Sequence, residues 1–168
     1  MVTLRSATNA DALAIADVHV RSWQVGYKGL LPQEFLDSLR PEDRASQYRL
    51  ESSDPSEPLT IVAEENGICG FVTFGPSRDT DDKGVGELYA LYVDPPRWSE
   101  GIGQLLVDAA RTQLHKQGQT EALVWMLATN VRAQNFYLRD GWQLDGGERG
   151  EDVWGISVHV IRMRRSLP

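Results

Sequence analysis

The chain has 168 residues, 41% of them hydrophobic, which predicts one domain with a single core over residues 1–168. Its net charge of −7 and pI near 4.9 exclude a large nucleic-acid-binding surface, and a single cysteine, Cys69, excludes an internal disulfide. Because no stretch resembles a signal peptide or reaches membrane-spanning length, we expect a cytoplasmic protein with no membrane or nucleic-acid partner.

The first half of the chain predicts a strand, two helices and a β-hairpin. Residues 2–7 predict the strand, and a helix with a polar cap follows until two glycines at positions 26 and 29. A second short helix over residues 32–39 begins with proline, and the polar segment 40–58 predicts further helical turns and a loop. Residues 59–65 and 68–75 then predict paired strands, because the Asn-Gly between them is the strongest short hairpin signal.

The second half centres on a strand followed by a helix. Residues 87–93 are aromatic and aliphatic and predict a buried strand after an Asp- and Gly-rich loop, 77–86. Apolar residues then recur at helical spacing from Ile102 to Leu114. Residues 121–127 predict another strand, and a helix opened by Asn130 and ended by Gly141 follows it. Residues 142–144 and 153–163 predict a last antiparallel pair around a Gly- and Glu-rich loop.

The turn between the central strand and its helix is suited to binding a phosphate. Gly101 and Gly103 lie where the helix begins, and the first turn of a helix has amide N–H groups without partners at the positive end of its dipole. Glycine lets an anion approach this backbone closely, so a pyrophosphate would fit here. Taken alone, Gly-x-Gly at such a turn is weak evidence, and a second motif is needed.

That second motif is Asn130-Val-Arg-Ala133-Gln-Asn-Phe136-Tyr137-Leu-Arg-Asp-Gly141-Trp142. Together, the turn and this segment resemble the acetyl-CoA loop and the Asn-x-x-Ala-x-x-Phe-Tyr box of the Gcn5-related N-acetyltransferase (GNAT) superfamily. The resemblance covers most of residues 59–147. The chain departs from the family pattern at Trp98, where Arg or Gln is usual, and at Glu100, which adds a negative charge beside an anion site.

The resemblance implies an α/β fold: a mixed, mostly antiparallel central sheet with helices on both faces and with splayed fourth and fifth strands. It also implies that acetyl-CoA lies in the gap between these strands. Its pantetheine arm would pair with the backbone of the fourth strand. We expect no metal cofactor, because the single cysteine and the scattered histidines form no ligand pattern. The cofactor-binding residues that the resemblance implies are Leu91, Tyr92, Val93, Trp98, Ser99, Glu100, Gly101, Ile102, Gly103, Gln104, Asn130, Asn135 and Phe136.

By the same resemblance, the chain is an acyltransferase that moves the acetyl group of acetyl-CoA to a primary amine of a small molecule or peptide. Direct attack needs a base for the amine, a donor to the thioester carbonyl and an acid for the thiolate. Glu87 is the candidate base, Val93 N–H the candidate donor and Tyr137 the candidate acid. Glu87 could instead be a solvated carboxylate at a strand edge, and Tyr137 a core residue beside Phe136.

The first two helices are candidates for the acceptor site. Trp23, Tyr27 and Leu30 combine aromatic faces with a turn, although Trp23 and Leu30 are as easily explained as core residues. The three histidines are scattered and are best explained as structural. The competing hypothesis is a non-catalytic acyl-CoA-binding or protein-interaction domain of the same fold, which Trp98 and Glu100 motivate. Dimers are common among proteins that this chain resembles, so a homodimer is compatible with the sequence.

Overall fold

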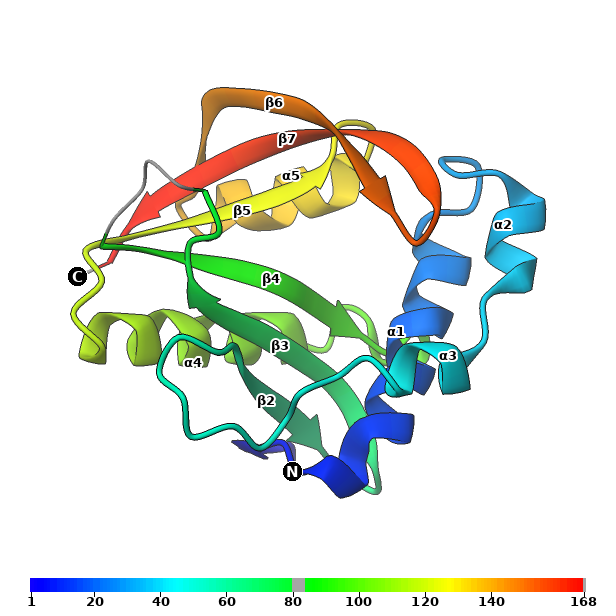
Figure 1. Cartoon of the computed structure of the whole chain (residues 1–168), viewed down its shortest axis with the longest axis horizontal. Coiled ribbons are helices and arrows are strands. Elements are labelled where there is room, and N and C mark those ends of the chain that lie inside the picture. The colour runs from blue at the N-terminus through cyan, green and yellow to red at the C-terminus, as the bar shows by residue number, and fades with distance from the viewer. Residues whose placement is uncertain (80–83, 168) are drawn as a thin grey trace.

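The structure is a computed structural model that describes residues 1–79 and 84–167. A seven-stranded sheet in the order β1-β2-β3-β4-β5-β7-β6 forms its centre (Figure 1). The order confirms the predicted mixed sheet, since every neighbouring pair is antiparallel except β4 and β5. The strands are β1 (Thr3–Ser6), β2 (Leu59–Glu64), β3 (Ile68–Pro76), β4 (Val85–Val93), β5 (Glu121–Leu127), β6 (Gln143–Val153) and β7 (Ile156–Ser166).

Helices cover both faces of this sheet. One face packs on α4 and α5, and the large buried core there includes Leu106, Leu114 and Trp142. The other face packs on α1, where Ile15 and Val18 contact Phe71 of β3. The helices are α1 (Ala12–Gly26), α2 (Gln33–Ser38), α3 (Pro41–Ala45), α4 (Ile102–Lys116) and α5 (Val131–Arg139), with single 3-10 turns at η1 (Asn9–Asp11) and η2 (Pro95–Arg97).

The parallel pair β4–β5 is paired over only part of its length. Val85 to Leu88 lie opposite Glu121 to Val124, and the rest of β4 has no partner on that side. β5 continues instead along β7, as far as the pair of Leu127 and Val160. The two strands therefore diverge toward their carboxyl ends, as the splayed strands of the predicted fold require (Figure 1).

A β-bulge in β4 changes which side chains face which helix. Thr73 lies opposite Ala90 and Phe74 opposite Leu88, so that Tyr89 is the additional residue. Alternation along a strand is shifted by one residue at such a point. Leu88 before the bulge and Leu91 after it therefore both pack in the core beneath α4.

The prediction for the chain's last strands was wrong in its boundaries. The Gly- and Glu-rich segment expected to be a loop is the middle of β6, which runs from Gln143 to Val153 and pairs with β7. Most of its side chains are exposed, so the strand lacks the apolar alternation from which strands are predicted. β4 also begins at Val85 inside the loop predicted over residues 77–86, and positions 80–83 of that loop lie outside the described residues.

In the described part of the chain, no helix combines the length and the hydropathy that are needed to cross a membrane.

Candidate active site

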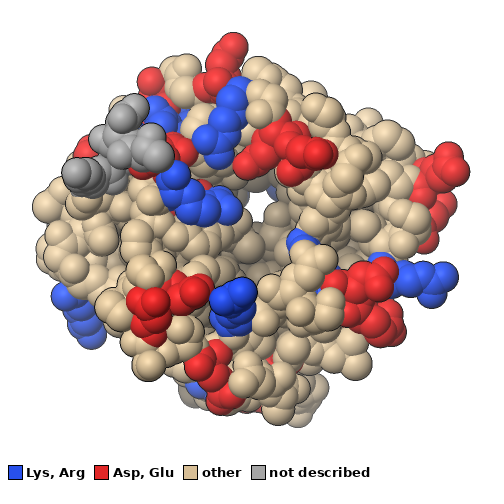
Figure 2. Space-filling view, in the orientation of Figure 1, with Lys and Arg blue, Asp and Glu red and all other residues tan. Residues whose placement is uncertain are grey.

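A cavity of about 400 Å³ lies where β4 and β5 diverge. Its walls come from the second half of β4, the middle of β5, the start of α4, the inner face of α5 and the end of α1. Figure 2 shows an opening in the middle of the molecule, in the same view as Figure 1. The cavity thus unites the two motifs that are separate in the sequence.

The charged residues that line this cavity are Arg97, Arg132 and Arg139, and the described lining contains no Asp, Glu, Lys or His. This composition is unusual in a chain with 24 acidic and 17 basic residues. Three guanidinium groups without a lining carboxylate favour an anionic ligand.

The start of α4 adds backbone donors to the same cavity. Gly101 precedes the helix with a φ of 85°, a left-handed conformation that glycine adopts without strain. The first α-helical hydrogen bond joins Leu105 N–H to the Gly101 carbonyl. Ile102, Gly103 and Gln104 therefore have no acceptor within the helix for their N–H groups, and all three residues line the cavity. This geometry is suitable for phosphate.

Gly103 has a second role in packing. A Cβ atom at this position would lie 3.3 Å from the ring of Phe136 in α5. The absence of a side chain therefore lets the first turn of α4 pack closely against α5. Both helices approach the mouth of the cavity at this contact.

Trp98, which departs from the family pattern, anchors the loop. Its indole N–H donates to the carbonyl of Val93 at 2.8 Å, and Ser22 Oγ donates to the same carbonyl at 3.0 Å. Glu100, the other departure, is paired with Arg97 at 2.5 Å and does not line the cavity. Arg97 also contacts Glu65 at 2.7 Å. Arg97 thus partly neutralises the carboxylate nearest the helix start.

The free edge of β4 has unpaired backbone groups. Asp94 N–H donates to the carbonyl of Cys69 at 2.8 Å. Hydrogen-bonded residues alternate along an antiparallel strand, so Tyr92 also bonds to β3, whereas Leu91 and Val93 do not. The N–H and C=O groups of Leu91 and the N–H group of Val93 consequently point toward the gap left by β5, whereas the Val93 carbonyl accepts from Trp98 and Ser22. This edge can pair with an extended ligand.

Tyr137 of α5 lies in the cavity wall and is 6% exposed. Its ring packs edge-on against Trp142 and Phe136, with centroid distances of 5.4 and 5.1 Å. Burial raises the pKa of its phenol well above the usual value. The side chain thus combines a core packing role with a protonated hydroxyl at the cavity.

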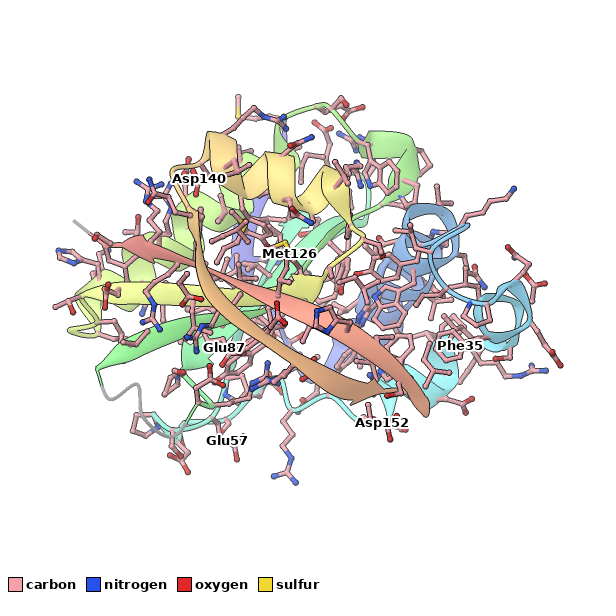
Figure 3. All side chains as sticks on the ribbon, turned by 90° about the horizontal axis from the view of Figure 1, so that it is seen from above. Phe35, Glu57, Glu87, Met126, Asp140 and Asp152 are labelled. Atoms are coloured by element: carbon pink, nitrogen blue, oxygen red, sulfur yellow. The ribbon has the colours of Figure 1, made fainter. Side chains whose placement is uncertain are left out.

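Glu87 of β4 is 1% exposed, but it does not itself line the cavity, whereas the next residue, Leu88, does. Its Oε1 accepts from the backbone N–H of Arg78 at 2.9 Å, and its Oε2 accepts from Arg78 Nε at 3.0 Å and from Arg78 Nη2 at 2.5 Å. Figure 3 labels Glu87 and also Met126, which lines the cavity from β5. Glu87 is therefore a buried, paired carboxylate rather than a solvated one.

An aromatic cluster borders the cavity on the side of α1. Tyr27 and Tyr92 line the cavity with their hydroxyl oxygens 3.4 Å apart, and burial raises the pKa of both phenols. Trp23 packs behind them and stacks on Trp154, with ring centroids 4.1 Å apart. Trp154 lies at the tip of the β6–β7 hairpin and also stacks beneath the guanidinium of Arg44.

Trp154 was missed at the sequence level. Its signal was a Trp-Gly turn, Trp154-Gly155, but this turn marks a hairpin tip only when both flanking strands are recognised. Through Trp154, the last two strands reach α1 and close one side of the gap (Figure 1).

The remaining predicted site residues divide into two groups. Asn130 lines the cavity and caps α5, its side chain accepting from Ala133 N–H at 3.1 Å. Asn135 and Leu30 are exposed and lie outside the lining. The predicted residues that the structure brings together in the cavity are Tyr27, Leu91, Tyr92, Val93, Trp98, Ser99, Gly101, Ile102, Gly103, Gln104, Asn130, Phe136 and Tyr137.

No group of three or more His, Cys, Asp or Glu side chains gathers as an ion-binding cluster in the described ranges.

Comparison with known proteins identifies relatives of the whole fold. Residues 17–142 match the acetyltransferase (GNAT) family model. The uncharacterized N-acetyltransferase YuaI of Bacillus subtilis is 32% identical over 131 residues, which are 77% of this chain and 74% of YuaI. Solved structures with the same fold include PaiA N-acetyltransferase of Thermoplasma acidophilum in complex with coenzyme A, with a TM-score of 0.74, 21% identity and 99% coverage of both chains. YncA of Salmonella typhimurium, solved with acetyl-CoA, has a TM-score of 0.72 and 18% identity, with 100% of this chain and 95% of YncA covered.

Proposed function

Since the chain belongs to the GNAT family of acetyltransferases, we propose that it transfers the acetyl group of acetyl-CoA to a primary amine of a small molecule or peptide. The single observation that carries this proposal is the cavity between β4 and β5, which combines arginines, free helix-start amides and a free strand edge. Coenzyme A is a polyanion joined to an extended amide-containing arm, and these features match it. Solved relatives that hold coenzyme A or acetyl-CoA support the same ligand.

The unpaired N–H and C=O groups of Leu91 would hold the amide-rich arm as a neighbouring strand would. This arrangement leaves Val93 N–H to donate to the thioester oxygen, while the Val93 carbonyl is already occupied by Trp98 and Ser22. A fixed donor at that oxygen favours the charge that develops there during attack.

Glu87 is the proposed proton acceptor. Among the described residues that line the cavity there is no carboxylate or imidazole, so the base must lie just beyond the lining. The other buried carboxylate, Asp140, is committed to Gln104, Arg111 and Trp142. Glu87 is buried beside the lining residue Leu88, and Arg78 donates two hydrogen bonds to its Oε2 but only one to its Oε1, so Oε1 keeps a lone pair that Arg78 does not occupy.

Tyr137 is the proposed acid. The acceptor nitrogen forms a bond to the acetyl carbonyl carbon, the carbon–sulfur bond breaks, and the nitrogen loses a proton to Glu87. Tyr137 then protonates the departing thiolate, since a tyrosine phenol is protonated at neutral pH even at its usual pKa. Acetyl-CoA supplies the activated acyl group, and no acyl-enzyme is needed.

The test pairs binding with turnover. Calorimetric titration with acetyl-CoA should give micromolar binding, and a panel of primary amines with detection of free thiol should then identify acceptors. Binding without thiol release on any amine would favour the non-catalytic acyl-CoA-binding domain. Absence of binding in a folded sample would contradict both.

A further inference from the structure

Of the cavity arginines that form no ion pair with a described carboxylate, one lies against the loop before α4. Arg132, the second residue of α5, places its guanidinium carbon 3.4 Å from the ring centroid of Trp98. In the described part of the chain no carboxylate pairs with it, whereas Arg97 is paired with both Glu65 and Glu100. A guanidinium stacked on an indole is fixed in direction but keeps its N–H donors free.

The packing of α5 on α4 aims Arg132 at the helix start. Arg132 and Phe136 are four residues apart and so share one face of α5. Phe136 is the residue that contacts the bare backbone of Gly103 in the first turn of α4. Arg132, Trp98 and the residues with free amides all line one cavity.

From this geometry we infer that Arg132 binds the diphosphate of the cofactor and that Trp98 serves as the platform that orients it. This inference rests on the proposed function, because it assumes that coenzyme A occupies the cavity. The side chain at position 98 itself carries no charge, so the cationic group at this loop comes from α5 instead. A bidentate guanidinium matches the paired oxygens of a diphosphate, and the N–H groups of Ile102, Gly103 and Gln104 supply the remaining donors.

The test compares Arg132→Gln with Arg44→Gln by calorimetric titration of the full chain. Arg44 is a matched control because its guanidinium also stacks on a tryptophan, at 4.2 Å from Trp154, but on the side of α1. Each variant loses one positive charge. We expect Arg132→Gln to weaken coenzyme A binding about tenfold, the loss of one charge-assisted contact, and Arg44→Gln to stay within twofold.

Dephospho-coenzyme A, which lacks the 3′-phosphate but keeps the diphosphate, locates the contact. If Arg132 binds the diphosphate, the substitution weakens coenzyme A and dephospho-coenzyme A by the same factor. A loss confined to coenzyme A would overturn the inference in favour of the 3′-phosphate. Equal affinities of wild type and Arg132→Gln would also overturn it and leave the proposed function intact, whereas failure of the wild type to bind would overturn both.

The platform role is tested by a double-variant cycle. We expect Trp98→Leu to weaken coenzyme A binding. Adding Arg132→Gln to this variant should weaken binding by less than a further threefold, because a guanidinium that is not stacked on Trp98 contributes little. Full additivity of the two losses would contradict the role of Trp98. Circular dichroism melts verify folding, and Arg132 is exposed and has no carboxylate partner, so its substitution should leave the melting temperature nearly unchanged.

Discussion

Arg78 contacts Glu87 three times, through its backbone N–H at 2.9 Å and through its guanidinium Nε at 3.0 Å and Nη2 at 2.5 Å. The carboxylate is 1% exposed, so this pairing is what makes a buried charge on β4 tolerable. Arg78 holds Glu87 as an oriented anion beside the cavity, and proton transfer to Glu87 weakens this attraction.

Glu87→Gln should lower kcat by about 100-fold or more, because the amide cannot take a proton. The deficit should shrink as pH rises toward 9.5, because more of the amine acceptor is then already neutral. Rates measured from pH 6 to 9.5, together with acetyl-CoA affinity, check this. A deficit that does not vary with pH would indicate a structural role for the Arg78 pair.

Tyr137→Phe should lower kcat about 100-fold and change the affinity for acetyl-CoA by less than twofold. The ring that packs on Trp142 remains, and only the hydroxyl is lost. Tyr89→Phe is a matched control, since Tyr89 also lines the cavity but directs its hydroxyl to the carbonyl of Pro76. Similar losses in kcat for both variants would contradict the acid role.

Trp154→Ala should raise the KM for the amine about tenfold and leave the affinity for acetyl-CoA unchanged. The indole stacks on Trp23 on the α1 side of the gap and does not itself line the cavity. Steady-state kinetics with the best amine and calorimetry with acetyl-CoA separate the two effects. An equal loss in both would show that Trp154 supports the fold as a whole.

Gly86→Ala should destabilise the protein by about 1–3 kcal/mol, because the new Cβ would lie 2.7 Å from a methyl group of Leu114 in the core. Gly150→Ala in β6 is the control, since the nearest atom there is 4.0 Å away. Urea unfolding of both variants checks the difference. Equal stabilities would mean that α4 shifts to make room.

Acidification should weaken the fold through His19. Burial lowers the pKa of this imidazole from 6.5 to about 3, so the unfolded chain takes up a proton that the folded chain does not. The stabilisation is complete above pH 6.5 and is lost as pH falls, by about 2 kcal/mol at pH 5. Urea unfolding at pH 7.5 and pH 5 should show this loss, and His19→Phe should show a smaller one.

Local signals explain why the phosphate loop and the box on α5 could be predicted. The glycines at the start of α4 and the cap at Asn130 determine the backbone conformation of their immediate neighbours. Such local effects can be predicted from the sequence without knowledge of the rest of the fold. β6 could not be predicted in this way because its half-buried positions, which alternate with exposed ones from Gly146 to Val153, include Arg149 and Glu151 rather than a row of apolar residues. Its register is instead set by its partner β7.

The contacts that complete the candidate site join residues that are distant in the chain. Trp98 meets Arg132, and Trp154 meets Trp23, only after the sheet has assembled. The spacing of these residues in the sequence does not predict that they are in contact. Glu87 illustrates the same limit, since its burial beside Arg78 depends on the turn back from β3 into β4.

The polar composition of β6 has a consequence for self-association. β6 is the longer of the two edge strands of the sheet. The unpaired backbone N–H and C=O groups of an edge strand can pair with a strand of another molecule. Within β6, Asp145, Glu148, Glu151 and Asp152 outnumber the single cation, Arg149. A second copy added along this edge would bring like charges together. The polar, acidic composition that made β6 difficult to predict therefore also disfavours edge-to-edge pairing between the sheets of two molecules.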